Sequence, residues 1–530
     1  MILHQELKWR NKMIRNVVNS IPTPSFEYAL LSPILIMFAA ACIGVIVEAF
    51  VSIQKRRFIH LIITFSSLIL ALFAVILQSG PQGRALAASG TVALDGPGWI
   101  LQGTILIAAL LSALLFAESK LDPLGDAFAP RASTLPGGQE EKTLTKLGWT
   151  QTEIWPLSSF AVAGMLLFVT ANDLLVLFVA LEVMSLPLYL LAGLARRRRL
   201  LSQEAALKYF LLGALASAIL LFGSALTYAY TGSLQFGQIS NGISAANNSP
   251  GLLSAAIALV AVGMLFKVGA VPFHQWVPDV YTGSPTPVTS FMAGAVKVAA
   301  FGGLLRVFYV AYGALVWDWR PLIWIVAGLT MIVGSVIALS QSDFKRMLAY
   351  SSIANGGFIL VGFSGTNRTS IAAVLLYLIV YVFSTVGAFA LLTLIREQAG
   401  ESSTLIRWKG IGKKSPLVAG LMSLFMLSFA GIPLTSGFTA KFGVFTAAIS
   451  GGATALVLVG VVASVIAAVF YVRVIILMFF SEPIPDGPFV SIPSIFTTIA
   501  ITVGAVMTLI IGLFPQFVIN LISSTSVFLR

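Results

Sequence analysis

Cysteine is almost absent from this chain, and histidine is rare. Cys42 is the single cysteine among 530 residues, which excludes an intrachain disulfide and a cysteine-held iron–sulfur or zinc site. Three histidines, His4, His60 and His274, are too few and too scattered to form a haem or metal site by themselves. No GxGxxG motif follows a predicted strand, and no GxxxxGK[ST] motif occurs. We therefore expect no metal, redox cofactor or nucleotide site on this chain.

Charged residues are also scarce. They make up 10% of the chain, against about 25% in a soluble domain, while 58% of the residues are hydrophobic. This composition predicts an integral membrane protein. The net charge of +12 does not predict nucleic-acid binding, because the basic residues fall in short loops between apolar runs, where they determine topology.

The apolar runs predict an all-α membrane protein with about fourteen transmembrane helices. A helix of about 20 apolar residues spans a bilayer, and these runs lack the alternation of a barrel strand. The predicted segments are 30–50, 59–78, 100–117, 155–171, 174–194, 205–229, 253–272, 288–311, 321–340, 346–364, 370–395, 416–450, 455–480 and 494–521.

Two of these segments contain helix-breaking residues at membrane depth. Pro272 stops segment 253–272, and Gly431 with Pro433 interrupts segment 416–450, which is too long for one helix. Broken helices are tolerated in lipid only where protein or water satisfies the freed backbone groups. Both segments are therefore predicted to be discontinuous helices.

The positions of the two breaks suggest an internal repeat. If 155–311 and 321–480 are five-helix units, each has its break near the fourth helix, and GAVPF (Gly269 to Phe273) weakly matches GIPL (Gly431 to Leu434). Two consecutive units of five helices have opposite orientations, so the pattern predicts two inverted repeats of the transporter kind. Two unrelated prolines are the alternative, since proline is common in transmembrane helices.

The other parts of the chain flank these units. Residues 26–117 are expected to form three N-terminal helices, 118–154 a mobile cytoplasmic loop without chemistry of its own, and 494–521 the last helix. Residues 1–25 are a basic N-terminal extension that lacks the apolar core of a signal peptide. They are interpreted either as a surface helix or as residues upstream of a true start at Met13.

The basic loops predict the orientation of the chain in its membrane. Loops after the first, fifth, ninth and eleventh segments contain Lys55 to Arg57, Arg196 to Arg199, Lys345 with Arg346, and Arg407 to Lys414. The alternate loops carry little beyond Arg84, Arg320 and Arg368. Because Lys and Arg are retained in the cytoplasm, the odd-numbered loops are predicted to be cytoplasmic and both termini to lie outside.

Five charged side chains lie inside apolar runs: Glu182, Lys208, Lys267, Lys297 and Lys441. A charge in hydrocarbon costs at least roughly 2.5–3.5 kcal/mol, so such residues usually face a hydrated pathway and mark an ion route. Lys208 lies near a helix end and alternatively reaches the membrane surface. For the three deeper lysines the alternative is structural pairing alone.

Other charged residues near helix ends have simpler interpretations. Asp173 is expected either to cap a helix or to join the site, but it points away from Glu182 on the same helix. Arg306 and Arg473 are interpreted as surface anchors, and Glu48 as a partner of the basic loop that follows it.

Lysines favour a proton over sodium as the transported ion. Burial disfavours the charged form of a lysine by roughly 4–7 kcal/mol, and a nearby carboxylate favours it. Movement of Glu182 toward or away from Lys208 or Lys267 is therefore expected to make the lysine bind or release a proton. A membrane potential of about 200 mV opposes the movement of one charge by about 4.6 kcal/mol, which is comparable with this cost of burying the ammonium group. His274, seven residues beyond Lys267, suits a proton relay, with a hydrogen bond to a loop carbonyl as the alternative.

Several motifs resemble one family of respiratory enzymes. The stretch FHQWVPDVYTGSPTPVTSFMAGAVKVAAF, Phe273 to Phe301, is similar to a signature of the proton-pumping NADH:quinone oxidoreductases, specifically of the N subunit, an antiporter-like membrane subunit of respiratory complex I. Further matches are NDLLVLFVALEVMSLPLYLLAG (Asn172 to Gly193), ALKYFLLGALASAILLFG (Ala206 to Gly223), QSDFKRMLAYSSIANGGF (Gln341 to Phe358) and FAGIPLTSGFTAKF (Phe429 to Phe442). They cover most of the chain from residue 150 onward.

The resemblance implies a role for each ionisable residue named above. The resemblance implies that Glu182 is the glutamate of the fifth helix, Lys208 the lysine of the sixth and Lys267 the central lysine of the broken seventh. It further implies that His274 is the histidine between the lysines, Lys297 the lysine of the eighth helix and Lys441 the exit-side lysine of the broken twelfth. The sister M subunit typically has glutamate where this chain has Lys441. The sister L subunit continues into a long lateral helix that is not expected here.

The resemblance also implies a function and partners. The chain is expected to translocate protons without a redox centre of its own, while other subunits bind NADH, FMN, iron–sulfur clusters and quinone. Expected partners are other membrane-arm subunits and lipid, with no nucleic acid. The alternatives are a subunit of a multi-chain sodium/proton antiporter, a ferredoxin-driven photosynthetic relative of complex I, and a scaffold that conducts nothing.

Overall fold

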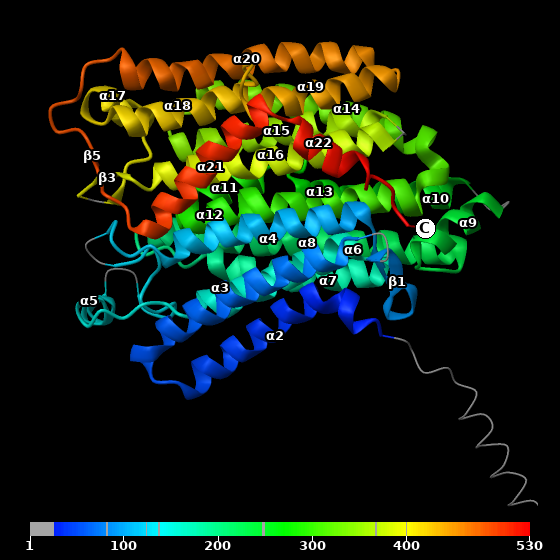
Figure 1. Cartoon of the computed structure of the whole chain (residues 1–530), viewed down its shortest axis with the longest axis horizontal. Coiled ribbons are helices and arrows are strands. Elements are labelled where there is room, and N and C mark those ends of the chain that lie inside the picture. The colour runs from blue at the N-terminus through cyan, green and yellow to red at the C-terminus, as the bar shows by residue number, and fades with distance from the viewer. Residues whose placement is uncertain are drawn as a thin grey trace, which may run out of the picture.

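The protein is a bundle of long helices that run in roughly the same or opposite directions (Figure 1). The computed structural model describes residues 26–80, 83–122, 125–135, 138–245, 250–365, 368–398 and 400–529. The basic extension 1–25 and Met13 therefore lie outside the described residues. Twelve described helices are long and apolar enough to cross a membrane, and each of the fourteen predicted segments overlaps a helix.

The N-terminal part contains three long helices and a β-hairpin. Its elements are α2 (Tyr28–Phe50), α3 (Ile53–Gln78), β1 (Ala85–Ala87), β2 (Val92–Leu94) and α4 (Gly96–Ala117). The two strands pair antiparallel, with Ala85 opposite Leu94. A short polar helix, α5 (Gln139–Lys146), follows in the segment after α4.

The first predicted unit, 155–311, contains a long buried helix formed by α12 and α13. Its elements are α6 (Ile154–Thr170), α7 (Leu174–Ala192), α8 (Arg199–Thr231), α9 (Phe236–Ala245), α10 (Pro250–Val268), α11 (Trp276–Gly283), α12 (Thr286–Phe291) and α13 (Lys297–Arg306). A π-helical turn, Met292–Val296, joins α12 to α13 and ends immediately before Lys297. Such turns occur often at functional sites, because they locally change the direction in which side chains point.

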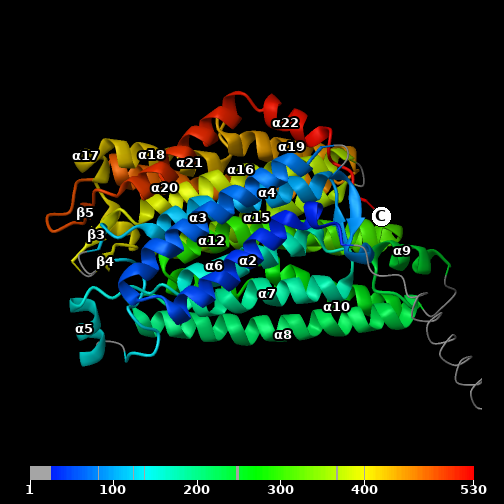
Figure 2. The ribbon, with the colours of Figure 1, turned by 60° about the horizontal axis from the view of Figure 1, so that its bottom comes forward.

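The second unit and the C-terminal helices complete the bundle. They comprise α14 (Val316–Ser340), α15 (Phe344–Val361), α16 (Arg368–Leu392), α17 (Ile411–Lys414), α18 (Pro416–Ala430), α19 (Ser436–Ser450), α20 (Thr454–Phe479), α21 (Ile495–Leu513) and α22 (Gln516–Ser523). The predicted last segment 494–521 is thus two helices, which separate at Pro515 because proline cannot continue a hydrogen-bonded helix. The membrane-length helices α12–α13, α15 and α16 lie in the interior, while α2, α3 and α8 lie at the periphery (Figure 2).

Both predicted helix breaks are present, and they have the same backbone geometry. Gly269 and Gly431 have φ values of 77° and 80°, which a side chain would strain. In the first break the N–H groups of Gly269 and Ala270 both donate to the carbonyl oxygen of Leu265 at 3.0 Å. In the second, the N–H groups of Gly431 and Ile432 both donate to the carbonyl oxygen of Leu427, at 3.0 and 3.1 Å. This is the hydrogen-bond pattern of a helix that ends at a left-handed glycine. The shared geometry supports the predicted relation between the two units.

Side chains from elsewhere satisfy the backbone groups that the first break leaves free. Trp276 Nε1 donates to the carbonyl oxygen of Phe266 at 2.9 Å, and the N–H of Val271 donates to Thr330 Oγ1 on α14 at 3.0 Å. The break is therefore closed by protein on both sides, as a non-helical segment at membrane depth requires.

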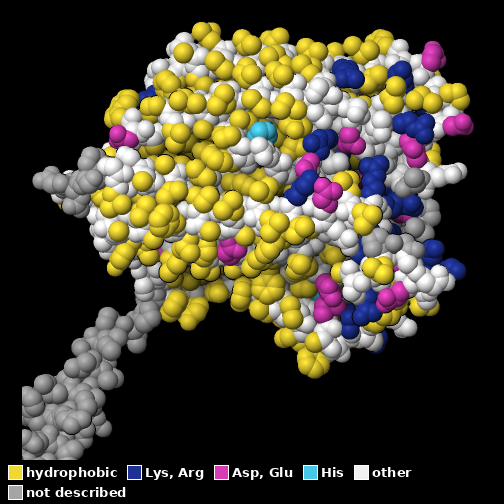
Figure 3. Space-filling view, turned by 180° about the vertical axis from the view of Figure 1, so that it is seen from behind, with side chains coloured by type: hydrophobic (Ala, Val, Ile, Leu, Met, Phe, Trp, Pro, Cys, Tyr) yellow, Lys and Arg dark blue, Asp and Glu magenta, His cyan; other side chains and the backbone are white. Residues whose placement is uncertain are grey.

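Charged side chains of both signs gather at one end of the molecule (Figure 3). This end carries α5, α17 and a small sheet of β3 (Ile395–Glu397), β4 (Gly400–Glu401) and β5 (Phe489–Val490), in the order β4-β3-β5. The described C-terminal residues lie at the opposite end (Figure 1). Exposed apolar side chains cover the helices between the two ends, as on Leu207, Leu211 and Leu215 of α8.

Candidate functional site

Lys267 lies at the end of α10, two residues before the first break. Its side chain is 5% exposed. Nζ donates hydrogen bonds to Ser185 Oγ at 2.7 Å and to Tyr209 OH at 3.3 Å, and lies 5.4 Å from the centre of the Tyr209 ring. Tyr209 stacks on Trp276 of α11, with ring centroids 4.7 Å apart. The ammonium is thus held between α7 and α8 by neutral hydroxyl groups.

Glu182 lies on α7, one turn before Ser185. Its carboxylate exerts an electrostatic influence on Lys267 and on Tyr189. Its buried Oε1 atom has no hydrogen-bond partner among the described residues. A buried carboxylate oxygen without a hydrogen-bond donor is costly to the fold.

Lys208 forms a different pair from the one considered in the sequence analysis. Its Nζ lies 2.6 Å from Glu204 Oε1 and 2.9 Å from Asp279 Oδ2, and the side chain is 43% exposed. The second Asp279 oxygen accepts a hydrogen bond from Arg346 Nη1 of α15 at 2.8 Å. Asp279, on α11, therefore bridges α8 and α15.

His274 lies in the break between α10 and α11. It is partly buried, and its ring is 6.5 Å from the Tyr350 ring of α15. The Nδ1 atom is buried without a hydrogen-bond partner among the described residues. The ring therefore lies at the helix break and beside α15.

Lys297 is the first residue of α13 and lies in the interior of the bundle. Its side chain is 5% exposed. Nζ donates to both the carbonyl oxygen and Oγ of Ser352 on α15, the latter at 2.6 Å. Ser352 Oγ also accepts a hydrogen bond from Tyr381 OH of α16 at 2.9 Å, and the Tyr381 ring lies 5.4 Å from the ammonium.

Buried polar groups on α15, α16 and α20 extend beyond Lys297. Tyr377 OH donates to Asn355 Oδ1 at 2.9 Å, and Asn355 Nδ2 lies 3.4 Å from Tyr471 OH. Tyr471 OH in turn shares a hydrogen bond of 2.5 Å with Ser351 Oγ. These hydroxyl and amide groups are linked to one another inside an otherwise apolar core.

Lys441 lies on α19, just beyond the second break. It is 5% exposed, and its Nζ donates to the carbonyl oxygen of Ala430 at 3.0 Å and to Ser464 Oγ at 2.9 Å. Ala430 is the last residue of α18, so the ammonium satisfies a carbonyl that the break leaves free. The charge also lies 4.3 Å from the Phe358 ring centre.

Asp173 and Arg306, which lie outside this group, differ in how they match the interpretations given to them from the sequence. Asp173 caps α7, where its Oδ1 accepts from the N–H groups of Leu175 and Val176. The surface-anchor interpretation of Arg306 is wrong. Its guanidinium is fully buried and pairs with Asp95 at 2.6 Å, because α4 supplies a buried carboxylate that no local pattern revealed.

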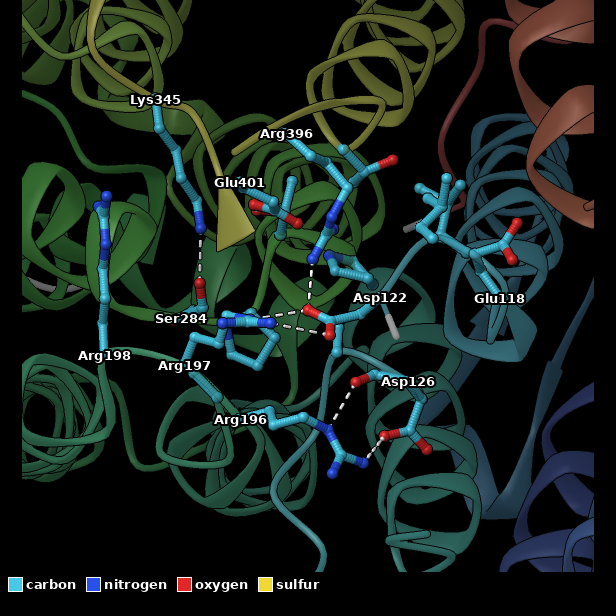
Figure 4. Close-up of a pocket in the computed structure, with 18 of the residues that line it drawn as sticks. Glu118, Asp122, Asp126, Arg196, Arg197, Arg198, Ser284, Lys345, Arg396 and Glu401 are labelled. Carbon is cyan, nitrogen blue, oxygen red and sulfur yellow. Dashed lines mark hydrogen bonds and ion pairs between the residues drawn. The ribbon is translucent and has the colours of Figure 1, made fainter. Parts of the chain in front are cut away.

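The segment 118–154, predicted as a mobile cytoplasmic loop without chemistry, contains buried ion pairs among its described residues. Asp126 pairs with Arg196 at 2.7 Å, and Asp122 binds Arg197 at 2.8 and 3.0 Å and also contacts Arg396 (Figure 4). These carboxylates are buried because the loop crosses the basic loops that end α7 and α16. The ion pairs fix the loop to the bundle.

The same charged residues line a cavity of about 100 Å³ (Figure 4). Sequence reasoning missed one of its lining residues, Lys345, and treated it only as a topology signal. In the structure Lys345 is the second residue of α15 and is 5% exposed, as buried as Lys267, Lys297 and Lys441. Within the described part of the chain, no group of three or more His, Cys, Asp or Glu side chains is arranged to hold a metal ion.

Comparisons with known proteins agree with the fold and motifs. Residues 171–467 match a family described as NADH:quinone oxidoreductase/Mrp antiporter, TM. An NADH-quinone oxidoreductase subunit N of Rhodococcus opacus is 52% identical over 96% of this chain and 98% of its own length. The corresponding subunit N of Parafrankia is also 52% identical, over 98% of this chain and 99% of its own length.

Solved structures give the same result. A chain of respiratory complex I from Thermus thermophilus with bound aureothin has a TM-score of 0.73 and 32% identity, covering 92% of this chain and 98% of that one. A chain of the Mrp complex from Dietzia has a TM-score of 0.78 at 22% identity, covering 94% and 97%, which shows a shared fold alone. The chain belongs to the family of NADH-quinone oxidoreductase N subunits, the antiporter-like, proton-translocating membrane subunits of complex I.

Proposed function

We propose that protons move through this subunit along Glu182, Lys208, Lys267, His274, Lys297 and Lys441, driven by quinone reduction on other subunits. The observation that carries the proposal is the polar connection at the centre of the bundle. Lys297 binds Ser352, and one turn further along α15 Asn355 begins the cluster that reaches Tyr471. Hydroxyl and amide groups at hydrogen-bond distance pass protons between ammonium groups more readily than apolar side chains do.

The three buried lysines of the route have neutral hydrogen-bond partners and form no ion pair among the described residues, which supports a role as proton carriers. Lys267, Lys297 and Lys441 are held by serine, tyrosine or carbonyl oxygens. An ammonium group that is buried without a carboxylate is costly in its charged form, so small shifts in neighbouring charge change its proton occupancy. Glu182, whose charge acts on Lys267, supplies such a shift in the first unit.

The test compares buried tyrosines that each lose one hydroxyl group. Tyr377→Phe removes the link to Asn355 and is expected to lower NADH-driven proton pumping in membrane vesicles while the complex still assembles. Tyr312→Phe is the matched control, because it removes a buried hydrogen bond of 2.7 Å to Thr227 that lies outside the route. Normal pumping by Tyr377→Phe together with Lys267→Met and Lys297→Met would contradict the proposal and favour the scaffold alternative.

We further propose that the charged end faces the bacterial cytoplasm and that both termini lie outside. The concentration of Arg and Lys at that end supports this orientation. In a Cys42→Ala background, a cysteine at Lys413 is expected to react with an impermeant maleimide only from the cytoplasmic side, and a cysteine at Gln516 only from outside. The reversed labelling pattern would reject the orientation.

The proposal includes the division of labour within the enzyme. We infer that this chain has no redox centre, and that NADH, FMN, iron–sulfur clusters and quinone bind to other subunits. Sister antiporter-like subunits and small membrane-arm subunits are the expected partners, together with lipid and without nucleic acid. The exposed apolar side chains of helices such as α8 and α20 supply surface for both lipid and protein contacts.

A further inference from the structure

Lys345 is a buried lysine at the charged end of the molecule that no step of the route above uses. It lies on α15, and its Nζ donates to the carbonyl oxygen of Ser284 at 2.5 Å (Figure 4). Its charged neighbours are Glu401, Asp343 and Arg198, and it forms no ion pair within 4.0 Å among the described residues. A lysine that serves only as a surface charge does not require burial at 5% exposure.

The cavity beside Lys345 contains room for water and proton-binding groups. Its volume of about 100 Å³ exceeds the roughly 10–15 Å³ that a single water molecule needs. Carboxylates and cations both line it, among them Glu401, Asp122 and Arg196. The Nη1 atom of Arg196 is buried there without a hydrogen-bond partner in the described chain, and buried polar groups of this kind commonly bind water.

A short path connects this cavity to Lys297. Lys345 and Ser352 are seven residues apart on α15, so they lie on the same face of the helix about 10 Å apart. Tyr281 lies on α11, three residues before Ser284, and its side chain interacts with that of Ser352. Ser352 Oγ is the group that binds Lys297 Nζ. Ser284, whose carbonyl oxygen binds Lys345, lies three residues after Tyr281, about one helical turn away.

We propose that Lys345 takes up protons from the cavity at the charged end and delivers them through Tyr281 and Ser352 to Lys297. One proton leaves the Lys345 ammonium group toward the Tyr281 hydroxyl, which passes a proton to Ser352 and thence to the neutral amine of Lys297. The Lys345 amine then takes one proton from the aqueous phase at the charged end, relayed through water in the cavity, which restores its charge and leaves the cavity water neutral. The proposal rests on the proposed function, because Lys297 must itself carry protons.

The test uses the assembled complex in membrane vesicles and measures NADH-driven acidification together with NADH oxidation. Lys345→Met and Lys345→Arg are both expected to lower proton translocation by roughly a hundredfold, the scale of a positioned proton-transfer group. Arginine keeps the positive charge and can still donate to Ser284, but it does not release its proton. Lys413→Met is the matched control, because Lys413 lies at the same end in an exposed pair with Glu482.

Three results would overturn the inference. Full pumping by Lys345→Arg would show that only the charge matters, and full pumping by Lys345→Met would show that the side chain is dispensable. If the Lys345 variants fail to assemble, Tyr281→Phe decides, since it keeps the ring and removes only the link to Ser352, and normal pumping would exclude the path. Lys267→Met separates the two proposals. Normal pumping by Lys267→Met would reject the proposed function. Loss of pumping by Lys267→Met, together with normal pumping by the Lys345 and Tyr281 variants, would reject this inference alone.

Discussion

Gly431 and Lys441 approach so closely that a Cβ atom on the glycine would lie 2.8 Å from Cδ of the lysine. The left-handed glycine that ends α18 thus also makes room for the lysine stem. The same lysine binds the carbonyl oxygen of Ala430, the residue immediately before Gly431. Helix break and buried charge form one local unit at this position.

Gly431→Ala is therefore expected to destabilise the subunit and to displace Lys441. The left-handed conformation costs alanine about 1–2 kcal/mol, and the lysine stem must also move away. Thermal unfolding of the purified complex and proton pumping in vesicles measure the two effects. Gly420→Ala in α18 is the control, since a Cβ there meets no atom within 4 Å, and it should leave both unchanged or slightly raise stability. Equal effects of the two variants would refute the argument.

Arg306→Met is expected to cost about 3–5 kcal/mol, because it leaves the fully buried Asp95 without its partner. The double variant Arg306→Met/Asp95→Asn should be less destabilised than the sum of the two single variants, since it removes both charges. Arg473→Met, which removes an exposed arginine that binds one carbonyl oxygen at 3.1 Å, should be close to neutral. The amount of assembled complex after heating distinguishes these outcomes, and additive effects at Asp95 and Arg306 would argue against a coupled pair.

Asp122→Asn should loosen the loop between α4 and α6. The change weakens contacts to Arg197 and Arg396, and hydrogen bonds to charged groups contribute about 1.5–3 kcal/mol each. Limited proteolysis is expected to cut residues 125–135 faster in this variant. Glu140→Gln tests the exposed pair with Arg131 and should change the rate little, because such pairs contribute about 0–1 kcal/mol. Unchanged cleavage of the Asp122 variant would mean that the ion pairs do not hold the loop.

Glu118 links the end of α4 to the start of α21 in a pH-dependent way. Burial alone would raise its pKa, but hydrogen bonds from Ser494, Lys120 and Thr497 outweigh this and lower the pKa below the usual 4.5. A lowered pKa in the folded state contributes stability above the unfolded value, and this stability is lost as the pH falls through the folded value. Wild-type stability should thus fall more steeply than that of Glu118→Gln when the pH drops below about 4.5. Parallel pH profiles from thermal unfolding would contradict this linkage.

The sequence by itself determined the membrane class, the positions of the helices and the residues on which the proposed route depends. Apolar runs of membrane length must form helices, because lipid satisfies no backbone hydrogen bond. The same physics made Lys267, Lys297 and Lys441 conspicuous, since a charge within such a run needs a reason. Glycine and proline located both helix breaks, because their backbone restrictions are local properties.

Only the tertiary structure decided which charges meet. Lys345 follows an ordinary helix cap and is buried where α15 packs against α11. Arg306 finds Asp95 across 211 residues of chain, and Asp122 finds Arg396 across 274. Hydropathy and spacing describe a residue's neighbours along the chain, whereas burial and ion pairing depend on groups that folding brings together from distant segments, so these relationships have no local signature.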